Sequence, residues 1–363
     1  MAGDSLSAVI CVCFLVALQV TSGANIGHFW HVTDFHYDHT YWSEQLSCND
    51  DVPQPGVFGD YWCDSPWRLV TDAIEAMTHI RSDVDFLVWT GDTVAHIHDD
   101  HLSVNINMDI MQNLTTAITK AFPNKTVYAT FGGYYTRLTA SGLRIVALNT
   151  NLYYTSDRQT PGHPDPAGQF QWFRTTMERA NSTGEKVIVI AHIPPGLHTP
   201  RGTLWFQTEF VQPFNSILTQ FAHNIVGMHF GHDHHDGFKI FYDAQVTPWR
   251  YKLPGQVGVP HNPAIRLVTF DRDTGRHLDI QQYYLDLPAS NKQDQAGAET
   301  TANFTLLFTT AAAEQEGTAK VCNKTCKARI LCGFKHYTMA DFDACVSQQC
   351  DDTCPNSGAI VGK

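Results

Sequence analysis

The amino-acid sequence predicts a layered α/β fold. Short runs rich in Val, Ile and Phe alternate with longer amphipathic stretches, and this alternation is typical of α/β layers. Aromatic residues make up 12% of the 363 residues and charged residues only 17%, against about 25% charged residues in an average globular protein. Such a chain can bury a large core. Its length allows two domains, or one large domain with an appendage, at about 150 residues per domain.

Seven short apolar runs predict the strands of this fold, because Val, Ile and Phe favour extended, half-buried or buried backbone. In chain order these runs are His28–Thr33, Asp85–Thr90, Thr126–Phe131, Leu143–Leu148, Lys186–Ala191, Asn224–Phe230 and Ile265–Phe270.

Three amphipathic stretches between these runs predict helices. The first begins at Ser65-Pro66 and extends to about Ile80, with Ser65 as the N-cap and Pro66 as the first helical residue. The other two are Leu102–Ala121 and Asp165–Ala180. Each predicted helix follows a predicted strand, as the alternation requires.

The alternation fades after about Leu287, so residues 25–287 are expected to form the main domain. Residues 288–320 are rich in Ala, Thr, Gln and Glu and suggest a linker or a loosely packed helix. Six cysteines then fall between Cys322 and Cys354. This density predicts a small Cys-rich C-terminal module, residues 321–354, stapled by cross-links.

The N-terminus has the pattern of a secretory signal peptide. Ala8–Val20 is apolar but too short to span a bilayer comfortably. The small residues Ser22-Gly23-Ala24 then place a cleavage point before Asn25, so residues 1–24 are the predicted signal peptide. Because this segment has Asp4 and no Lys or Arg, a buried N-terminal segment is the alternative. The short polar stretch Pro355–Lys363 predicts neither a transmembrane anchor nor a complete lipid-anchor signal.

Cysteines and glycosylation motifs agree with an oxidising compartment. Eight cysteines remain after residue 24, and their default interpretation is disulfides of undetermined connectivity. A zinc knuckle is the alternative for the last six. Cys48 and Cys63 are the favoured pair because both lie in one inserted loop. The eight are Cys48, Cys63, Cys322, Cys326, Cys332, Cys345, Cys350 and Cys354.

Five N-x-[ST] motifs predict a glycosylated chain that is secreted to the extracellular space or, alternatively, lysosomal. They lie at Asn113, Asn124, Asn181, Asn303 and Asn323.

Charge and histidine content narrow the function. The net charge of −12 argues against a protein that binds nucleic-acid polymers through their backbone. The 19 histidines are unusual, and several follow predicted strands directly. His98 and His101, in contrast, are expected to be solvated loop residues.

Four predicted strands run into side chains that bind divalent metals. The motifs are Asp34-Phe35-His36, Gly91-Asp92, His192-Ile193-Pro194-Pro195 and Gly231-His232-Asp233-His234. Each motif alone is common. Together they indicate a shared site, because ligands of α/β sheets bind beyond the carboxyl ends of strands. Carboxylates and imidazoles suit two divalent ions held close together, with one Asp bridging both.

The ordered motifs resemble the calcineurin-like metallophosphoesterases, whose blocks are D-x-H, G-D, G-N-H-[DE], a His and G-H-x-H. Four further stretches resemble the acid sphingomyelinase-like phosphodiesterase 3 branch, and the Cys-rich end does so too. The resemblance covers nearly the whole chain after residue 24, without the saposin domain of acid sphingomyelinase. The stretches are Asn149–Thr155, Ala191–Gly196, Val246–Trp249 and Asn262–Arg266.

The resemblance implies a four-layer α/β/β/α sandwich with two zinc ions at one edge. One ion would take Asp34, His36, Asp92 and His234, and the second would take Asp92, His192, His232 and the Asn of G-N-H-[DE]. His96 matches a histidine close to the scissile phosphate, which could protonate the leaving alkoxide. Two such ions would lower the pKa of water between them and stabilise charge on the phosphoryl oxygens.

The sequence departs from the family pattern where G-N-H-[DE] should follow Thr126–Phe131. It reads Gly132-Gly133-Tyr134-Tyr135-Thr136 there, as if an internal deletion had joined two family segments. The residues up to Leu143 suffice for a hairpin around Ala140-Ser141-Gly142 but not for a helical crossover. A second gap is expected near residue 245.

The first deletion removes both the Asn ligand of the second ion and a histidine expected to act as a general acid. Zinc can bind three protein ligands plus water, so loss of the ion does not follow. Losing a general acid typically costs about 10²–10⁴ in rate.

Three hypotheses follow. The first is a secreted zinc-dependent phosphodiesterase that acts on nucleotide or phospholipid-like diesters with low or absent activity. It is expected to be a monomer, and its association with a membrane surface is left open. The second is an inactive pseudoenzyme that serves as a glycoprotein binding module. The third is an incomplete gene model or splice variant of an active enzyme.

Overall fold

The computed structural model describes residues 24–48, 54–198, 203–234, 237–242, 248–253, 262–295 and 301–310. Residues 1–23 of the predicted signal peptide lie outside the described residues. So do the predicted Cys-rich module with its six cysteines, the motif at Asn323 and the second predicted gap near residue 245.

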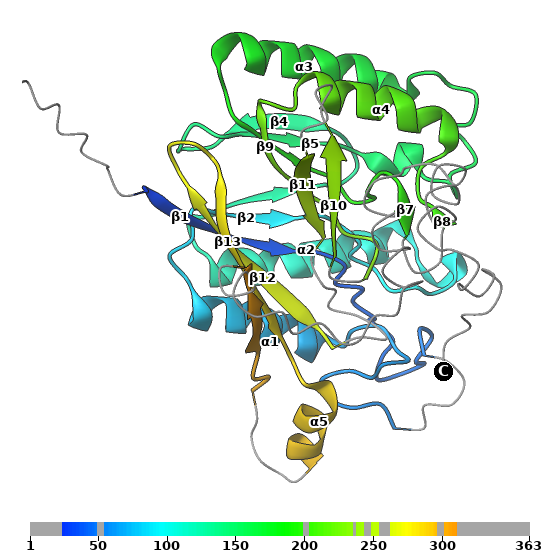
Figure 1. Ribbon diagram of the computed structural model, residues 1–363. Helices are drawn as coiled ribbons and strands as arrows, with labels where there is room; N and C mark the ends of the chain where they lie inside the picture. Colours follow the sequence, from blue (N-terminus) through cyan, green and yellow to red (C-terminus); the bar gives the residue numbers. More distant parts are fainter. Residues whose placement is uncertain are drawn as a thin grey trace, which may run out of the picture.

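Two six-stranded sheets form the centre of the molecule (Figure 1). The first has the order β14-β13-β12-β1-β2-β3, in which β1, β2 and β3 are parallel. The second has the order β10-β11-β9-β6-β5-β4, in which β5, β6 and β9 are parallel. The first sheet comprises β1 Ile26–Val32, β2 Phe86–Trp89, β3 Thr126–Ala129, β12 Ala264–Asp271, β13 His277–Tyr284 and β14 Thr305–Thr309; the second comprises β4 Tyr135–Leu138, β5 Arg144–Ala147, β6 Val187–Ile190, β9 Ile225–His229, β10 Gly237–Tyr242 and β11 Pro248–Leu253.

Helices cover the outer face of each sheet. In Figure 1, α1 (Trp67–Ile80) and α2 (Val104–Ala121) lie on one side of the two sheets, and α3 (Gln169–Thr183) and α4 (Thr208–Gln220) lie on the other. The predicted four-layer α/β/β/α sandwich is therefore confirmed. The smaller elements are β7 Leu197–His198, β8 Thr203–Leu204, α5 Leu287–Gln295 and the short 3₁₀ helices Asp99–His101, Thr150–Tyr153 and Pro166–Gly168. None of the helices in the described part combines the length and apolar character needed to cross a bilayer.

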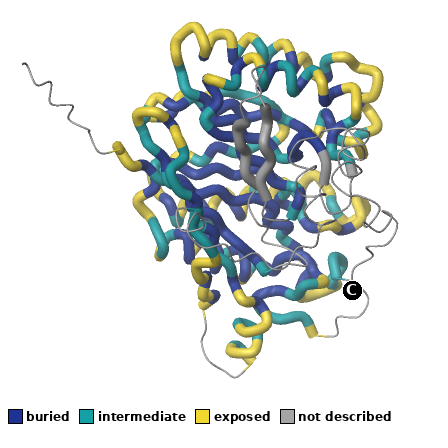
Figure 2. The backbone as a smooth tube through the Cα atoms, in the orientation of Figure 1, coloured by how far each residue is buried: buried dark blue, intermediate teal, exposed yellow. Residues whose placement is uncertain are grey.

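The core consists of three layers of apolar side chains, and the buried strands occupy the middle of Figure 2. Successive residues of a strand point to opposite faces of the sheet. On β1, Trp30 packs with the core that includes α1 and α2, whereas Phe29 packs between the sheets with Phe86 and Phe270. Because both faces of the central strands are buried, their sequences read as nearly continuous apolar runs.

The helix starts differ from the predictions in detail. Pro66, not Ser65, is the N-cap of α1. The backbone of Ser65 is instead engaged with the loop after β1: its N–H donates to the carbonyl of His36, and its carbonyl accepts from Asp38. The start of α3 is Gln169 rather than Asp165, because a short 3₁₀ turn precedes it.

Helix α4 and several strands, among them β10, β11, β13 and β14, were not predicted, whereas α5 fits the alternative of a loosely packed helix in residues 288–320. Pro213 lies inside α4, and an internal proline weakens the sequence signal for a helix. Within the stretch 288–320, α5 occupies Leu287–Gln295 and β14 pairs with β13. Neither element carries a strong apolar period.

The chain crosses directly from the first sheet to the second after β3. Five residues, 130–134, join β3 to β4, and β4 then forms an antiparallel hairpin with β5. The N–H of Gly142 donates to the carbonyl of Thr139 in the turn, where Gly142 has a φ of 83°. The predicted hairpin around Ala140-Ser141-Gly142 is confirmed.

We expect Phe29→Ala to lower the free energy of unfolding by about 3–5 kcal/mol, because it leaves a cavity between the two sheets. Phe29 is fully buried, and its ring stacks on Phe86 at a centroid distance of 4.8 Å. Leu138→Ala, at a side chain 51% exposed on β4, is the control and should change stability by less than about 0.5 kcal/mol. Denaturant titration of both variants measures the difference; equal losses would contradict this packing.

Candidate metal centre

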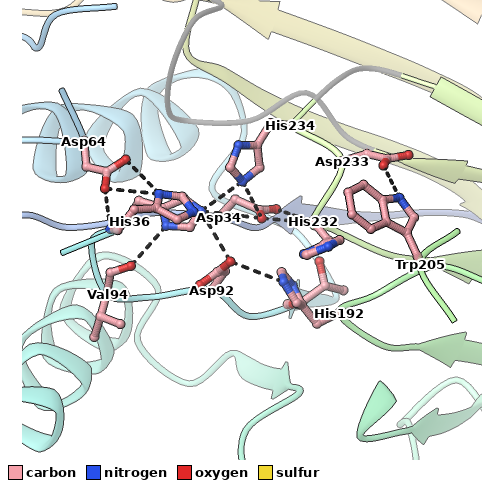
Figure 3. Close-up of polar contacts among 12 residues, drawn as sticks. Asp34, His36, Asp64, Asp92, Val94, His192, Trp205, His232, Asp233 and His234 are labelled. Carbon is pink, nitrogen blue, oxygen red and sulfur yellow. Dashed lines mark hydrogen bonds and ion pairs between the residues drawn. The ribbon is translucent and has the colours of Figure 1, made fainter. Parts of the chain in front are cut away.

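All six predicted ligand residues lie together where four strands end (Figure 3). Asp34 and His36 follow β1, and Asp92 follows β2, its neighbour in the first sheet. His192 follows β6, while His232 and His234 follow β9, its neighbour in the second sheet. The cluster therefore joins the carboxyl ends of both sheets, as the strand-end motifs predict.

Asp92 occupies the centre of this cluster. Its Oδ2 lies 3.4 Å from His36 Nε2 and 3.3 Å from His192 Nε2. Asp34 Oδ1 lies 3.4 Å from His234 Nε2 and 3.7 Å from His36 Nε2. One carboxylate oxygen of Asp92 thus stands between an imidazole of the first sheet and an imidazole of the second. A ligand shared by two ions requires this placement.

The backbone at the cluster is held in an unfavourable conformation. Eight non-glycine residues in the described part have positive φ, and five of them are predicted ligands. A left-handed non-glycine residue costs on the order of 1–3 kcal/mol, so such residues gather where function demands them. Backbone hydrogen bonds between the loops hold these residues in place. The N–H of Asp34 donates to the carbonyl of Gly91 (2.9 Å), and the N–H of Gly231 donates to the carbonyl of His192 (2.8 Å). The five are Asp34 (51°), His36 (42°), Asp92 (52°), His232 (73°) and His234 (53°).

A glycine is required at position 231. A Cβ there would lie 2.1 Å from Thr33 Oγ1 and 2.5 Å from Asp34 Oδ2. The G-H-x-H motif therefore needs its glycine so that the loop after β9 can approach the loop after β1.

Carbonyl groups set the tautomers of two histidines. His36 Nδ1 lies 3.0 Å from the carbonyl of Val94, and His192 Nδ1 lies 2.9 Å from the carbonyl of Thr90. A carbonyl only accepts, so each Nδ1 donates its proton, and Nε2 is the nitrogen that faces the carboxylates. This arrangement of a second hydrogen bond behind the ring is typical of metal-binding histidines.

His232 provides an independent test of whether the residues fit a metal. Its Nε2 is buried and has no hydrogen-bond partner among the described residues. Its ring is flanked by Trp205 and Tyr154, at centroid distances of 4.4 Å and 5.0 Å. Burial, reinforced by the nearby His192, lowers the pKa of His232 to about 3. The lone pair is therefore available, and a cation would satisfy it.

The electrostatics of the cluster favour positive charge. Burial opposes a charged His36, but the carboxylates of Asp92, Asp34 and Asp64 outweigh it and raise the pKa of His36 to about 10. Burial likewise opposes charge on Asp34 and Asp92, yet the surrounding histidines hold the pKa of both carboxyls below the ordinary range. The ionised carboxylates thus favour protonated His36 and His192, and a divalent metal would replace these protons. These N and O donors suit a divalent metal.

The donors fall into two sets that share Asp92. The first contains His36, Asp92, His96 and His234, and the second contains Asp92, His192 and His232. The second set holds the three side chains that the family resemblance implied for one ion. The first set differs from the implied one in containing His96, while the implied ligand Asp34 lies 3.4 Å from His234 Nε2. The second has three side chains in the described part of the chain, since the link after β3 contains no Asn.

His96 lies against the first set but faces differently. Its ring stacks on that of His36 at 4.0 Å between centroids, with an interplanar angle of 22°. Nitrogen lone pairs lie in the ring plane, so two nearly parallel stacked rings cannot both point at one cation. His96 is therefore placed beside the ions rather than as a ligand of the same ion as His36.

Asp64 is a site residue that the sequence motifs did not indicate. It is buried, and its carboxylate oxygens both lie 3.2 Å from His96 Nδ1. Although burial would raise the pKa of Asp64, the hydrogen bond with His96 and the nearby His36 hold it below its ordinary value. The one sequence feature that could have pointed to Asp64 is its position directly after Cys63, which forms the predicted disulfide with Cys48.

The remaining predictions concern the surface. His98 and His101 are exposed beside the site, as expected. Four of the predicted glycosylation residues are exposed as well, namely Asn113, Asn124, Asn181 and Asn303.

We expect the purified chain to bind more than one zinc ion per molecule, and Asp92→Ala to bind fewer than half an ion, because both sets lose their shared ligand. Elemental analysis after dialysis measures the ratio. Asp72→Asn is the matched control, since Asp72 is a buried carboxylate on α1 that accepts the N–H of Ala302. An Asp92→Ala protein that keeps its zinc would contradict the shared site.

Comparisons with known proteins agree with this geometry. No protein-family model matches the chain. Acid sphingomyelinase-like phosphodiesterase 3b of Mus musculus is 32% identical over 336 residues, which cover 75% of this chain and 74% of that protein. Cyclic GMP-AMP phosphodiesterase SMPDL3A of Bos taurus is 30% identical over 349 residues, covering 79% and 77%.

Among solved structures, a dimetal phosphatase from Danio rerio superposes with a TM-score of 0.44 and 12% identity, covering 70% of this chain and 95% of that one. The sequence relationship decides the assignment. The chain belongs to the acid sphingomyelinase-like phosphodiesterases, a family of phosphoric diester hydrolases.

Proposed function

We propose that this protein is a secreted phosphodiesterase that uses two zinc ions to hydrolyse small phosphodiesters. The observation that carries the proposal is the position of Asp92 Oδ2, between His36 Nε2 at 3.4 Å and His192 Nε2 at 3.3 Å. A carboxylate shared in this way supports two neighbouring ions. Family membership supports the reaction type, and the substrate is a nucleotide-like or phospholipid-like diester.

Each residue of the cluster has a role in this reaction. Asp34, His36, Asp92 and His234 would hold one ion, and Asp92, His192 and His232 would hold the other. When bound, the ions lower the pKa of water and neutralise charge that develops on the phosphoryl oxygens. The carbonyls of Val94 and Thr90 orient His36 and His192. His96 would donate a proton from Nε2 to the leaving oxygen.

The composition of the site is the reason to expect lower activity than in the rest of the family. The five-residue link after β3 lacks the Asn and the His of G-N-H-[DE]. The second ion would therefore have three protein ligands, and His96 would be the remaining candidate for the general acid. This three-ligand set also supports the alternative function, a glycoprotein that binds diesters without turning them over.

The proposed compartment is extracellular, with the lysosome as the alternative. It is supported by the signal-peptide pattern at residues 1–24, the Cys48–Cys63 disulfide and the exposed glycosylation motifs. A monomeric state, the lack of nucleic-acid polymer binding and the unsettled association with membrane surfaces stay predictions from the sequence.

We expect the zinc-loaded chain to cleave bis-p-nitrophenyl phosphate slowly at mildly acidic pH. Asp92→Ala should abolish this cleavage, because neither ion would keep its shared ligand, whereas Asp72→Asn should retain it. Release of p-nitrophenolate measures the rate. Unchanged turnover in Asp92→Ala would refute the two-metal mechanism, and no turnover in the zinc-loaded chain would favour the binding module.

We expect Gly133→Asn to strengthen zinc binding at the second set and to raise turnover, because it returns an amide to the second position of the missing block. A Cβ at Gly133 meets no atom within 4 Å, so the substitution is sterically free. Gly133→Ala is the matched control. Titration with zinc and the diester assay give the readouts, and equal behaviour of the two variants would contradict this explanation of low activity.

A further inference from the structure

His96 is exposed yet held in one orientation. Its side chain is 58% exposed, but one ring face stacks on His36. Its backbone N–H donates to Asp64 Oδ2, and its Nδ1 lies 3.2 Å from both oxygens of Asp64. An ionised carboxylate only accepts, so Nδ1 carries the donated proton. Nε2 is left for a reacting group.

A disulfide holds Asp64 in place. Ser47 precedes Cys48, Asp64 follows Cys63, and the Cys48–Cys63 bond joins them. The N–H of Asp64 donates to Ser47 Oγ at 2.9 Å, and Ser47 Oγ donates to Asp38 Oδ2 at 2.7 Å. The Asp64 side chain is only 7% exposed. The disulfide therefore holds the segment in which the buried carboxylate of Asp64 faces the exposed imidazole of His96.

We propose that Asp64 is a positioning residue that fixes the orientation and tautomer of His96, so that His96 Nε2 can protonate the leaving group. The inference rests on the proposed function, because it concerns the same reaction. It assigns a mechanistic purpose to the Cys48–Cys63 loop, which supplies none of the metal ligands.

The acid is the imidazolium form of His96, which carries a proton on each ring nitrogen. The bond between phosphorus and the leaving oxygen breaks, its electron pair stays on that oxygen, and the oxygen takes the Nε2 proton of His96. A bond forms between phosphorus and the oxygen of the attacking water, which gives up a proton. His96 is then neutral, with its remaining proton on Nδ1 facing Asp64. It regains a proton equivalent to the one released by water.

Asp64→Asn tests this role without changing the size of the side chain. The single amide oxygen is needed by the backbone N–H of His96, so the amide NH₂ faces Nδ1 and favours the tautomer with the proton on Nε2. Neutral His96 would then no longer donate a hydrogen bond from Nδ1, and protonated His96 would lose the carboxylate beside it. Asp72→Asn is the control, since Asp72 and Asp64 are each 6% exposed.

Two diaryl phosphodiesters with different leaving groups separate positioning from structural support. Diphenyl phosphate has a poor leaving group that needs a proton, whereas bis-p-nitrophenyl phosphate releases a stable anion. We expect Asp64→Asn to lower kcat/KM about 10- to 100-fold for diphenyl phosphate, within the range of general acid catalysis, and less than about threefold for the nitrophenyl diester. Equal losses on both substrates, or a selective loss in Asp72→Asn, would overturn the proposal.

A spectroscopic readout separates this inference from the proposed function. ¹⁵N NMR at a pH where His96 is neutral should show its proton on Nδ1 in the wild type and on Nε2 in Asp64→Asn. If the wild type cleaves no diester, the proposed function fails, and the spectrum still decides whether Asp64 orients His96. The same tautomer in both proteins would overturn the inference.

Discussion

The placement of two ionised carboxylates in a buried volume is the constraint on which the site depends. Oxygens of Asp34 and Asp92 face the Nε2 atoms of His36 and His192, whose Nδ1 atoms donate to the carbonyls of Val94 and Thr90. Buried negative charge is unfavourable unless protons or cations lie beside it, and the carboxylates raise the pKa of both histidines. A divalent cation would replace these imidazole protons and offset the cost of the left-handed backbone at the same residues. The loops are therefore organised around charge rather than around apolar packing.

The layered fold brings these groups together from distant parts of the chain. Strands β1 and β9 belong to different sheets, yet the loops that follow them meet, and the N–H of His232 donates to Asp34 Oδ1 at 3.0 Å. Beneath the site, His31 of β1 and His229 of β9 meet between the sheets, with their Nδ1 atoms 3.2 Å apart. Burial lowers the pKa of His31 well below its ordinary value, which favours a neutral His31 ring in this contact. It aligns the two strand ends that carry the ligands.

The link after β3 shows how a local change in sequence alters chemistry without altering architecture. Residues 130–134 carry the chain from one sheet to the other, and the β4–β5 hairpin forms normally. The sheets need only the strands and a connection of sufficient reach. The site, in contrast, would need a particular amide and imidazole at this point. Because the fold tolerates the short connection, His96 and the Asp64 loop become the feature that decides how the leaving group is protonated.

The sequence by itself determined seven of the strands, the metal-binding motifs and the family. Apolar runs such as Lys186–Ala191 are local signals, and the four strand-end motifs identify six ligand residues in order. It could not predict α4, whose internal Pro213 breaks the local pattern, or β14, which is specified by pairing with β13.

Tertiary structure alone decided the role of Asp64 and the geometry of His96. Asp64 belongs to no motif, and its meaning comes from a disulfide and from a histidine 32 residues away. Stacking on His36 fixes the plane of the His96 ring, and Asp64 engages its Nδ1. Local sequence encodes backbone preference and side-chain chemistry, whereas the direction of a lone pair depends on neighbours that only folding brings into contact.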